Sequence, residues 1–372
     1  MPPTNKIRVL VVDDSAFMRK AISLMIGDDP EIEVIGTANN GEDGLQKVLE
    51  LSPDLVTMDI EMPRMDGLTA LRKIMAEKPT PVMMVSSLTS EGAQATLDAL
   101  DLGAVDFIPK QLSYVSLDIV KIKEELIAKI KHINARKRIL MSQAKNRGIF
   151  GRSASASAQP SANRHLEAPK PVALPTPGSK TIKKHMRIVA IGTSTGGPPA
   201  LQAVVPRLPK EFPVPVMVVQ HMPPTFTASL ANRLNNSSAL QVKEAEHGER
   251  IERGLVYIAP GDKHMTVNKM GAYSTIKLSN EPHDTLYKPC VDIMMNSVED
   301  HYRGSTLGVI MTGMGSDGAI ALKRIKADGG IVIAQNEDTC VVYGMPRAVV
   351  EAGIADRISP IERIANDIVS FF

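Results

Sequence analysis

Along roughly the first 130 residues, short apolar segments alternate with stretches in which apolar residues recur at helical spacing. Five of these segments end in polar or turn-forming residues, which is typical of buried parallel strands. They lie at residues 7–12, 32–38, 55–58, 81–87 and 105–108. Between them apolar residues recur at helical spacing, and Ser15 is a candidate N-cap for the first helix. Five strands interleaved with helices predict a doubly wound (βα)5 domain of the α/β class.

The chain from residue 185 onward repeats this alternation. Strands are predicted at residues 187–191, 214–219 and 307–311, and helices at residues 198–208 and 319–327. Segments of this kind, each strand followed by a helix, favour a parallel sheet with helices on its faces. We therefore expect a second α/β domain that is Rossmann-like, with a mainly parallel sheet.

The residues between these two regions have the composition of a linker. Residues 134–184 carry 11 basic side chains and one acidic side chain, together with Ser-Ala repeats and several prolines. Large apolar residues are scarce there, so the segment cannot bury enough surface to offset its chain entropy. We predict domains at residues 1–133 and 185–372, joined by a flexible basic linker at residues 134–184. On composition alone, we expect this linker to provide spacing and solubility rather than to bind nucleic acid or an acidic partner surface.

Overall composition narrows the classes of function. The formal net charge is +2, aromatic residues make up 3% of the chain, and tryptophan is absent. These values argue against a stacking platform for single-stranded nucleic acid, and the second domain lacks a basic recognition patch for DNA. Two cysteines exclude a disulfide framework. No apolar run reaches the ~18 residues of a membrane span, and no secretory signal is visible, so we expect a cytoplasmic protein without direct membrane insertion.

Polar side chains gather at the predicted strand ends of the first domain: Asp13 and Asp14 after the first strand, Asp59 after the third, Ser86 in the fourth and Lys110 after the fifth. Ligands of open α/β sheets bind at the carboxyl ends of the strands, so these side chains should meet at one rim. Clustered carboxylates favour a hard divalent cation such as Mg²⁺, and a neighbouring lysine suits phosphoryl chemistry. The alternative interpretation is that these are unrelated turn residues. Five polar residues at matching strand ends disfavour that interpretation.

Three motifs carry a family resemblance in this domain. Val-Val-Asp-Asp-Ser at 11–15, Asp-Ile-Glu-Met-Pro-Arg-Met-Asp-Gly at 59–67 and Phe-Ile-Pro-Lys at 107–110 resemble the receiver domain of two-component response regulators. The resemblance implies that a histidine kinase phosphorylates Asp59. It also implies a Mg²⁺ site and a set of switch residues. The Mg²⁺ ligands would be Asp13, Asp14, Asp59 and the backbone carbonyl of Glu61, and the switch residues would be Ser86, Phe107 and Lys110.

The second domain carries a candidate nucleophile. Gly-Thr-Ser-Thr-Gly at 192–196 lies between a predicted strand and helix, where Ser194 would be exposed on a tight turn. The same loop could instead hold a phosphate at a helix N-terminus, and the motif alone leaves both interpretations open. His221 and Asp317 follow other predicted strands, so they should share the rim with Ser194 as base and orienting carboxylate. His264 is the main rival base because it too follows a strand.

Four motifs of this domain resemble the catalytic domain of chemotaxis protein-glutamate methylesterases. They lie at residues 191–198, 220–223, 259–264 and 311–318. The resemblance implies hydrolysis of γ-glutamyl methyl esters on the cytoplasmic helices of chemoreceptors, with release of methanol, and deamidation of receptor glutamines. It assigns Ser194 as nucleophile, His221 as base and Asp317 as orienting residue. Thr195 would help to position the imidazole, and the backbone N–H of Met314 would serve the oxyanion hole.

The resemblance also implies control. The unphosphorylated receiver would limit access to Ser194, and phosphorylation of Asp59 would relieve this inhibition. We expect no cofactor for the hydrolysis itself, because the second domain offers no metal-ligand spacing. Two other classes of function remain as alternatives: an anion-binding module without chemistry, and a transcriptional regulator that uses the basic linker.

Overall fold

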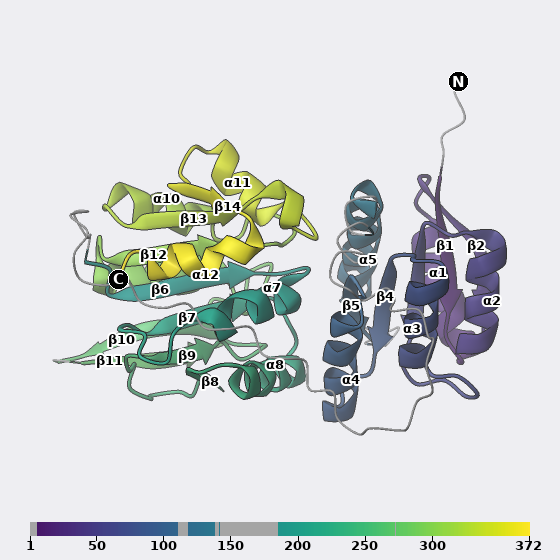
Figure 1. Cartoon of the computed structure of the whole chain (residues 1–372), viewed down its shortest axis with the longest axis horizontal. Coiled ribbons are helices and arrows are strands. Elements are labelled where there is room, and N and C mark those ends of the chain that lie inside the picture. The colour runs from purple at the N-terminus through teal and green to yellow at the C-terminus, as the bar shows by residue number, and fades with distance from the viewer. Residues whose placement is uncertain (1–5, 111–117, 138–140, 142–184, 272) are drawn as a thin grey trace, which may run out of the picture. The chain divides into compact units, whose positions relative to one another are not determined.

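The computed structural model describes residues 6–110, 118–137, 141, 185–271 and 273–372 (Figure 1). The chain divides into two compact units, Met1–Arg164 and His165–Phe372, each with its own core. The division falls inside the predicted linker at residues 134–184. Most of that linker prediction lies outside the described residues. Among the described residues, no helix combines the length and the apolar character needed to span a bilayer.

The first unit is built on a five-stranded parallel sheet with the order β2-β1-β3-β4-β5. The strands are β1 (Ile7–Val12), β2 (Ile32–Ala38), β3 (Leu55–Asp59), β4 (Val82–Ser86) and β5 (Asp106–Pro109). The three central strands β1, β3 and β4 are buried almost throughout, because helices cover both faces of the sheet. The predicted doubly wound α/β fold is confirmed, with strand ends that differ by one residue at most.

Five helices complete the first unit: α1 (Ala16–Gly27), α2 (Gly41–Leu51), α3 (Gly67–Glu77), α4 (Ser90–Asp101) and α5 (Asp118–Ala135). Helix α1 packs against α5, and α3 packs between α2 and α4, which gives the two helical layers. Each of the first four helices begins at a side chain that caps its free N–H groups. The capping residues are Ser15, Asn40, Asp66 and Thr89.

The second unit contains a seven-stranded parallel sheet with the order β14-β13-β12-β6-β7-β9-β8. These strands are β6 (Ile188–Thr193), β7 (Val216–Gln220), β8 (Gln241–Glu244), β9 (Leu255–Ile258), β12 (Thr306–Ile310), β13 (Ile331–Gln335) and β14 (Arg357–Ser359). A separate antiparallel pair, β10 (His264–Met270) and β11 (Tyr273–Ser279), packs against helix α9. This arrangement confirms the prediction of a mainly parallel α/β domain.

The helices of the second unit are α7 (Gly197–Val204), α8 (Pro224–Ser237), α9 (Val291–Tyr302), α10 (Ala319–Ala327), α11 (Met345–Glu351) and α12 (Ile361–Val369), with short 3-10 turns at η1 (Val205–Arg207) and η2 (Glu337–Thr339). The helix predicted at residues 198–208 ends early, at Val204. Pro206 lacks the backbone N–H that an α-helix needs for its hydrogen bond to the carbonyl four residues earlier, so the α-helix stops and the chain tightens into the η1 turn.

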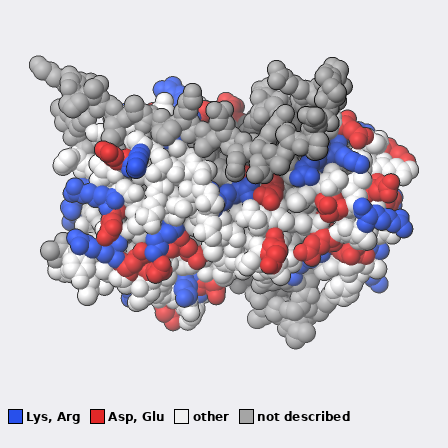
Figure 2. Space-filling model, turned by 60° about the horizontal axis from the view of Figure 1, so that its bottom comes forward, with Lys and Arg blue, Asp and Glu red and all other residues white. Residues whose placement is uncertain are grey.

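Charged side chains are mixed on the surface. On the face that Figure 2 shows, basic and acidic side chains lie among one another over the described residues. Over the described residues, this face therefore carries no continuous basic stripe of the kind that follows a nucleic-acid backbone.

Candidate functional sites

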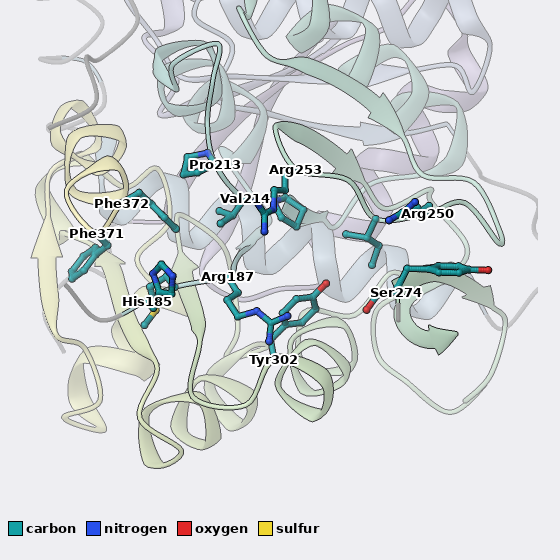
Figure 3. A pocket seen from close by; sticks show the side chains of 14 residues that line it. His185, Arg187, Pro213, Val214, Arg250, Arg253, Ser274, Tyr302, Phe371 and Phe372 are labelled. Atoms are coloured by element: carbon teal, nitrogen blue, oxygen red, sulfur yellow. The ribbon is translucent and has the colours of Figure 1, made fainter. Parts of the chain in front are cut away.

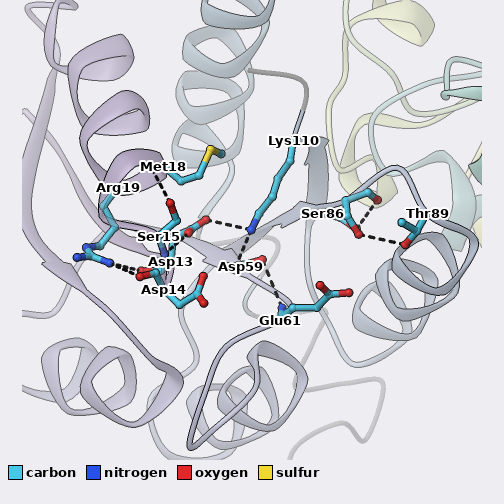
Figure 4. A network of polar contacts seen from close by, with 11 residues as sticks. Asp13, Asp14, Ser15, Met18, Arg19, Asp59, Glu61, Ser86, Thr89 and Lys110 are labelled. Atoms are coloured by element: carbon cyan, nitrogen blue, oxygen red, sulfur yellow. Dashed lines mark hydrogen bonds and ion pairs between the residues drawn. The ribbon is translucent and has the colours of Figure 1, made fainter. Parts of the chain in front are cut away.

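The predicted polar residues of the first unit meet at the carboxyl edge of its sheet (Figure 4). Asp13 directly follows β1, Asp59 ends β3, Ser86 ends β4, and Lys110 directly follows β5. The parallel register brings these strand ends to the same level, since Asp59 pairs with Val85 and Ser86 pairs with Pro109 in the ladders.

Three carboxylates form the centre of this edge, here called the carboxylate rim. One oxygen from each of Asp13, Asp14 and Asp59 lies within 4.8 Å of the others. Lys110 Nζ lies 2.6 Å from Asp59 Oδ2 and 3.4 Å from Asp13 Oδ2. Burial raises the pKa of Asp59 to about 6, and the charge of Asp13 adds to this against the opposing contact with Lys110. Burial likewise raises the pKa of Asp13.

These residues fit a hard divalent cation. Their donor atoms are all carboxylate oxygens, which Mg²⁺ prefers, and one of them belongs to the exposed Asp14 and is accessible from solvent. Burial lowers the pKa of Lys110, but its hydrogen bond with Asp59 and the charges of both partners outweigh burial and raise it. The backbone N–H of Glu61 donates to Asp59 Oδ1 over 3.3 Å, so the segment that would offer the Glu61 carbonyl is held beside the cluster.

The predicted switch residues Ser86 and Phe107 have partners away from Asp59. Ser86 is buried, and its Oγ donates to the carbonyl oxygens of Gly92 at 3.1 Å and Ser87 at 3.2 Å. Phe107 is 6% exposed, and its carbonyl oxygen accepts a hydrogen bond from Lys129 Nζ at 3.0 Å. This conformation therefore has the aromatic side chain packed inward.

The second unit also brings its predicted site residues to one edge. Strands β12, β6 and β7 are neighbours in the sheet. Ser194 directly follows β6, His221 directly follows β7, and Asp317 lies in the loop between β12 and α10. The carboxyl ends of three adjacent parallel strands thus carry the three residues that the sequence assigned as nucleophile, base and orienting carboxylate.

His221 and Asp317 form a buried pair. His221 Nε2 lies 2.8 Å from Asp317 Oδ2, and the two side chains are 7% and 8% exposed. Asp317 also accepts backbone N–H bonds from Val291 at 2.7 Å and Asp292 at 2.9 Å. Burial alone would raise the pKa of Asp317, but the hydrogen bond and charge of His221 and the two N–H donors bring it to about 2. Asp317 is therefore ionised at neutral pH.

The other ring nitrogen of His221, the candidate base, is Nδ1, which is buried without a partner among the described residues. When Nε2–H donates to Asp317, Nδ1 is the atom that can accept a proton. Ser194 is half-buried, and its backbone N–H donates to the Thr312 carbonyl at 3.0 Å. Within the described residues, no hydrogen bond joins Ser194 Oγ to the imidazole in this conformation.

The segment of residues 311–318 packs directly against the Ser194 turn. A Cβ on Gly313 would lie 2.8 Å from Ser194 Cβ, so only glycine permits this approach. Thr312 Oγ1 donates to the Thr195 carbonyl at 2.8 Å, and the Thr195 side chain is buried. The Met314 N–H has no acceptor among the described residues, and Met314 follows Gly313, which packs beside the candidate nucleophile Ser194.

Gln220 is a site residue that sequence reasoning missed. Its side chain is 2% exposed, and Nε2 donates to the carbonyls of Ser194 at 2.9 Å and His221 at 3.0 Å. Its Oε1 accepts a hydrogen bond from the Thr193 hydroxyl. A Cβ on Gly197 would overlap this amide at 1.8 Å, which explains a glycine there. The sequence signal that could have indicated Gln220 is its position as the polar last residue of β7, an otherwise apolar strand.

Cys290 and Tyr287 were missed as well. Cys290 Sγ lies 3.2 Å from Asp317 Oδ1, and burial together with that carboxylate raises the thiol pKa to about 12, so the thiol is a donor here. The Tyr287 ring stacks on the His221 imidazole with centroids 4.1 Å apart. His264, the rival base, begins β10 and is fully buried, and it bonds to the Pro282 carbonyl rather than to the triad candidates.

A cavity of about 470 Å³ lies elsewhere in this unit (Figure 3). Its lining includes Arg187, Pro215 and Arg253, which precede β6, β7 and β9 respectively. These positions are the amino ends of the strands, whereas Ser194 and His221 stand at the carboxyl ends. The cavity is therefore separate from the candidate catalytic rim.

A receiver and a hydrolase-like α/β domain in one chain define a response regulator whose output is an enzyme. Family models agree: response regulator receiver domain matches residues 9–119, and CheB methylesterase matches residues 189–368. Protein-glutamate methylesterase/protein-glutamine glutaminase 1 of Oleidesulfovibrio alaskensis is 51% identical over 367 residues, which cover 98% of this chain and 99% of the relative. The chain therefore belongs to the family of protein-glutamate methylesterases/protein-glutamine glutaminases.

Other relatives extend the comparison. The protein of that name from Pyrococcus abyssi is 44% identical, with 99% of this chain and 95% of the relative covered. Among solved structures, the Thermotoga maritima CheB methylesterase catalytic domain is 44% identical, and the match covers 50% of this chain and 99% of that one with a TM-score of 0.49. The family assignment favours an enzyme over the DNA-binding and purely anion-binding alternatives.

Proposed function

We propose that this chain hydrolyses γ-glutamyl methyl esters on the cytoplasmic helices of chemoreceptors, and that it deamidates receptor glutamines at the same site. The observation that carries the proposal is the buried His221–Asp317 pair, in which the imidazole Nδ1 has no partner among the described residues. His221 follows β7, the strand that lies next to β6, and Ser194 follows β6. An imidazole that is oriented by an ionised carboxylate and has one open nitrogen is suited to act as a general base.

The reaction follows from these roles. Ser194 Oγ attacks the γ-carbonyl carbon while its proton passes to His221 Nδ1, and the Met314 N–H donates to the oxyanion that forms. The imidazolium, stabilised by Asp317, then gives the proton to the departing methoxy oxygen, and methanol leaves. Water attacks the acyl-enzyme by the same route and releases a glutamate side chain. With a glutamine substrate the leaving group is ammonia.

Control resides in the carboxylate rim of the receiver, at Asp13, Asp14 and Asp59. Asp59 accepts a phosphoryl group from a histidine kinase, and Lys110 and Ser86 contact the phosphoryl oxygens. Asp13, Asp14, Asp59 and the Glu61 carbonyl would hold a Mg²⁺ ion, which would supply positive charge to offset that of the transferring phosphoryl group. The unphosphorylated receiver limits access to Ser194, and phosphorylation of Asp59 relieves this inhibition.

The direct test is methanol release from a methylated chemoreceptor in the presence of a phosphodonor. Ser194→Ala should remove activity, whereas Ser316→Ala should retain it, because Ser316 is an exposed serine of the neighbouring loop with no assigned role. Circular dichroism checks that both variants fold. If Ser194→Ala kept more than a few per cent of the wild-type kcat, the nucleophile would be misassigned. If the wild type released no methanol, the proposed activity would be wrong.

A further inference from the structure

The face of the His221 imidazole is covered by a tyrosine outside the four sequence motifs. The rings of His221 and Tyr287 are nearly parallel, with an interplanar angle of 14° and centroids 4.1 Å apart. Tyr287 belongs to residues 280–289, here called the site loop, which connects β11 to α9. The imidazole is thus held at one edge by Asp317 and on one face by the site loop.

The far end of Tyr287 reaches the predicted oxyanion segment. A Cβ built on Gly315 would lie 3.6 Å from the Tyr287 hydroxyl oxygen, which is ordinary van der Waals distance. Gly315 directly follows Met314, whose N–H is the candidate oxyanion donor. One side chain therefore spans the distance from the candidate base to the segment that would stabilise the oxyanion.

The site loop is fixed by the buried His264. His264 Nε2 lies 3.2 Å from the Pro282 carbonyl oxygen and 3.2 Å from Thr285 Oγ1, both in the site loop. On the other side of Tyr287, the Lys288 carbonyl accepts a hydrogen bond from the Asp262 N–H at 3.2 Å. The segment of residues 262–264 thus anchors the site loop on both sides of Tyr287. This gives the motif at residues 259–264 a structural role.

The stacked Tyr287 ring restricts a motion of the imidazole that the hydrogen bond to Asp317 leaves free. A single hydrogen bond at Nε2 fixes that atom, but the imidazole plane can still tilt about it. A parallel ring at van der Waals distance removes the tilt and keeps water from one face of the pair. Misplacement of a catalytic group by about 1 Å can cost on the order of 100-fold in rate.

We propose that Tyr287 is a positioning residue for the hydrolysis, which holds the plane of the His221 imidazole, and that His264 acts only as the anchor of the loop that carries it. This inference rests on the proposed function of Ser194 and His221. It assigns the stacking role to the aromatic ring of Tyr287 and assigns no role in proton transfer to His264.

The test compares kcat and KM for methanol release by the full chain with a saturating phosphodonor. Tyr287→Phe keeps the ring and should retain kcat within about 3-fold. Tyr287→Ala should lower kcat by about 10–100-fold, with KM changed by less than about 3-fold. Thermal unfolding of both variants should match the wild type. A Tyr287→Ala variant with wild-type kcat, or an equal loss in Tyr287→Phe, would overturn the proposal.

The anchor is tested by a double-mutant cycle. His264→Gln should lower kcat by itself, but it should add little in a Tyr287→Ala background, because both changes act through the same ring. Multiplicative losses in the double variant, or abolition of activity by His264→Gln alone, would show a separate role for His264 and contradict the assignment. Ser194→Ala assayed in parallel keeps failure of this inference distinct from failure of the proposed function.

Discussion

At the scale of single residues, Gln220 joins the segments that carry the candidate nucleophile and base. Replacing it with leucine would leave the Thr193 hydroxyl and two backbone carbonyls without their buried partner, at a cost of about 1–3 kcal/mol for each unsatisfied group. We therefore expect Gln220→Leu to lower both kcat and the free energy of unfolding. Gln241→Leu, at an exposed strand position, is the matched control and should change neither. Unchanged kcat in Gln220→Leu would contradict this account.

The pKa of Asp317 predicts how stability depends on pH. Its folded value of about 2 lies below the ordinary 3.8, so the ionised group stabilises the fold above pH ~4, and this contribution is lost as pH falls toward 2. A lowering of this size corresponds to about 2 kcal/mol. The difference in unfolding free energy between wild type and Asp317→Asn should therefore shrink by roughly that amount between about pH 5 and pH 2. Urea unfolding of the second domain measures it, and a difference independent of pH would refute the assignment.

At the scale of elements, helix α5 is held to β5 by a buried ion pair. Lys129 is 8% exposed, and its Nζ lies 2.8 Å from Asp106 and donates to the Phe107 carbonyl. Removing one partner of a buried pair leaves an uncompensated charge, which typically costs about 3–5 kcal/mol. We expect Lys129→Met to destabilise the receiver by that amount in urea unfolding.

The control for that variant is another lysine of the same helix. Lys123 pairs with Asp28 at 2.6 Å, but the two side chains are 34% and 68% exposed. Exposed pairs contribute about 0–1 kcal/mol, so Lys123→Met should change stability little. Equal losses in the two variants would mean that burial does not set the strength of the Lys129 pair.

The elements also show how far the sequence predicts the site. Strands β1 and β6 are mostly apolar, with Arg8 and Thr193 as the polar exceptions, so the pattern alone places the residues after them, Asp13 and Ser194, at a sheet edge. Tyr287 cannot be placed in this way. Its contact with His221 depends on the site loop, and the path of that loop depends on hydrogen bonds to His264 that no local pattern reveals. The early end of α7 is predictable in principle from Pro206.

At the scale of the whole molecule, metal dependence should separate the two domains. Among the described residues, the carboxylate cluster that could hold a metal ion lies in the receiver, at Asp13, Asp14 and Asp59. A chelator should therefore block activation by a phosphodonor and leave the basal rate of the unphosphorylated chain unchanged. Methanol release with and without the chelator measures this, and loss of the basal rate would indicate a metal in the hydrolysis itself.

A receiver regulates a hydrolase only if phosphorylation distinguishes two states of the chain. We propose that the unphosphorylated receiver limits access to Ser194 and that phosphorylated Asp59 releases this inhibition. Coupling of this kind is commonly worth about 1–3 kcal/mol, or about 5–150-fold in rate.

The most direct measurement is receptor demethylation by the full chain, by Asp59→Asn and by a fragment of residues 185–372, each with and without a phosphodonor. A phosphodonor should raise the rate of the full chain, leave Asp59→Asn at its basal rate, and leave the fragment unchanged at a rate above that of the unphosphorylated full chain. Equal rates from the fragment and the unphosphorylated full chain would contradict inhibition by the receiver.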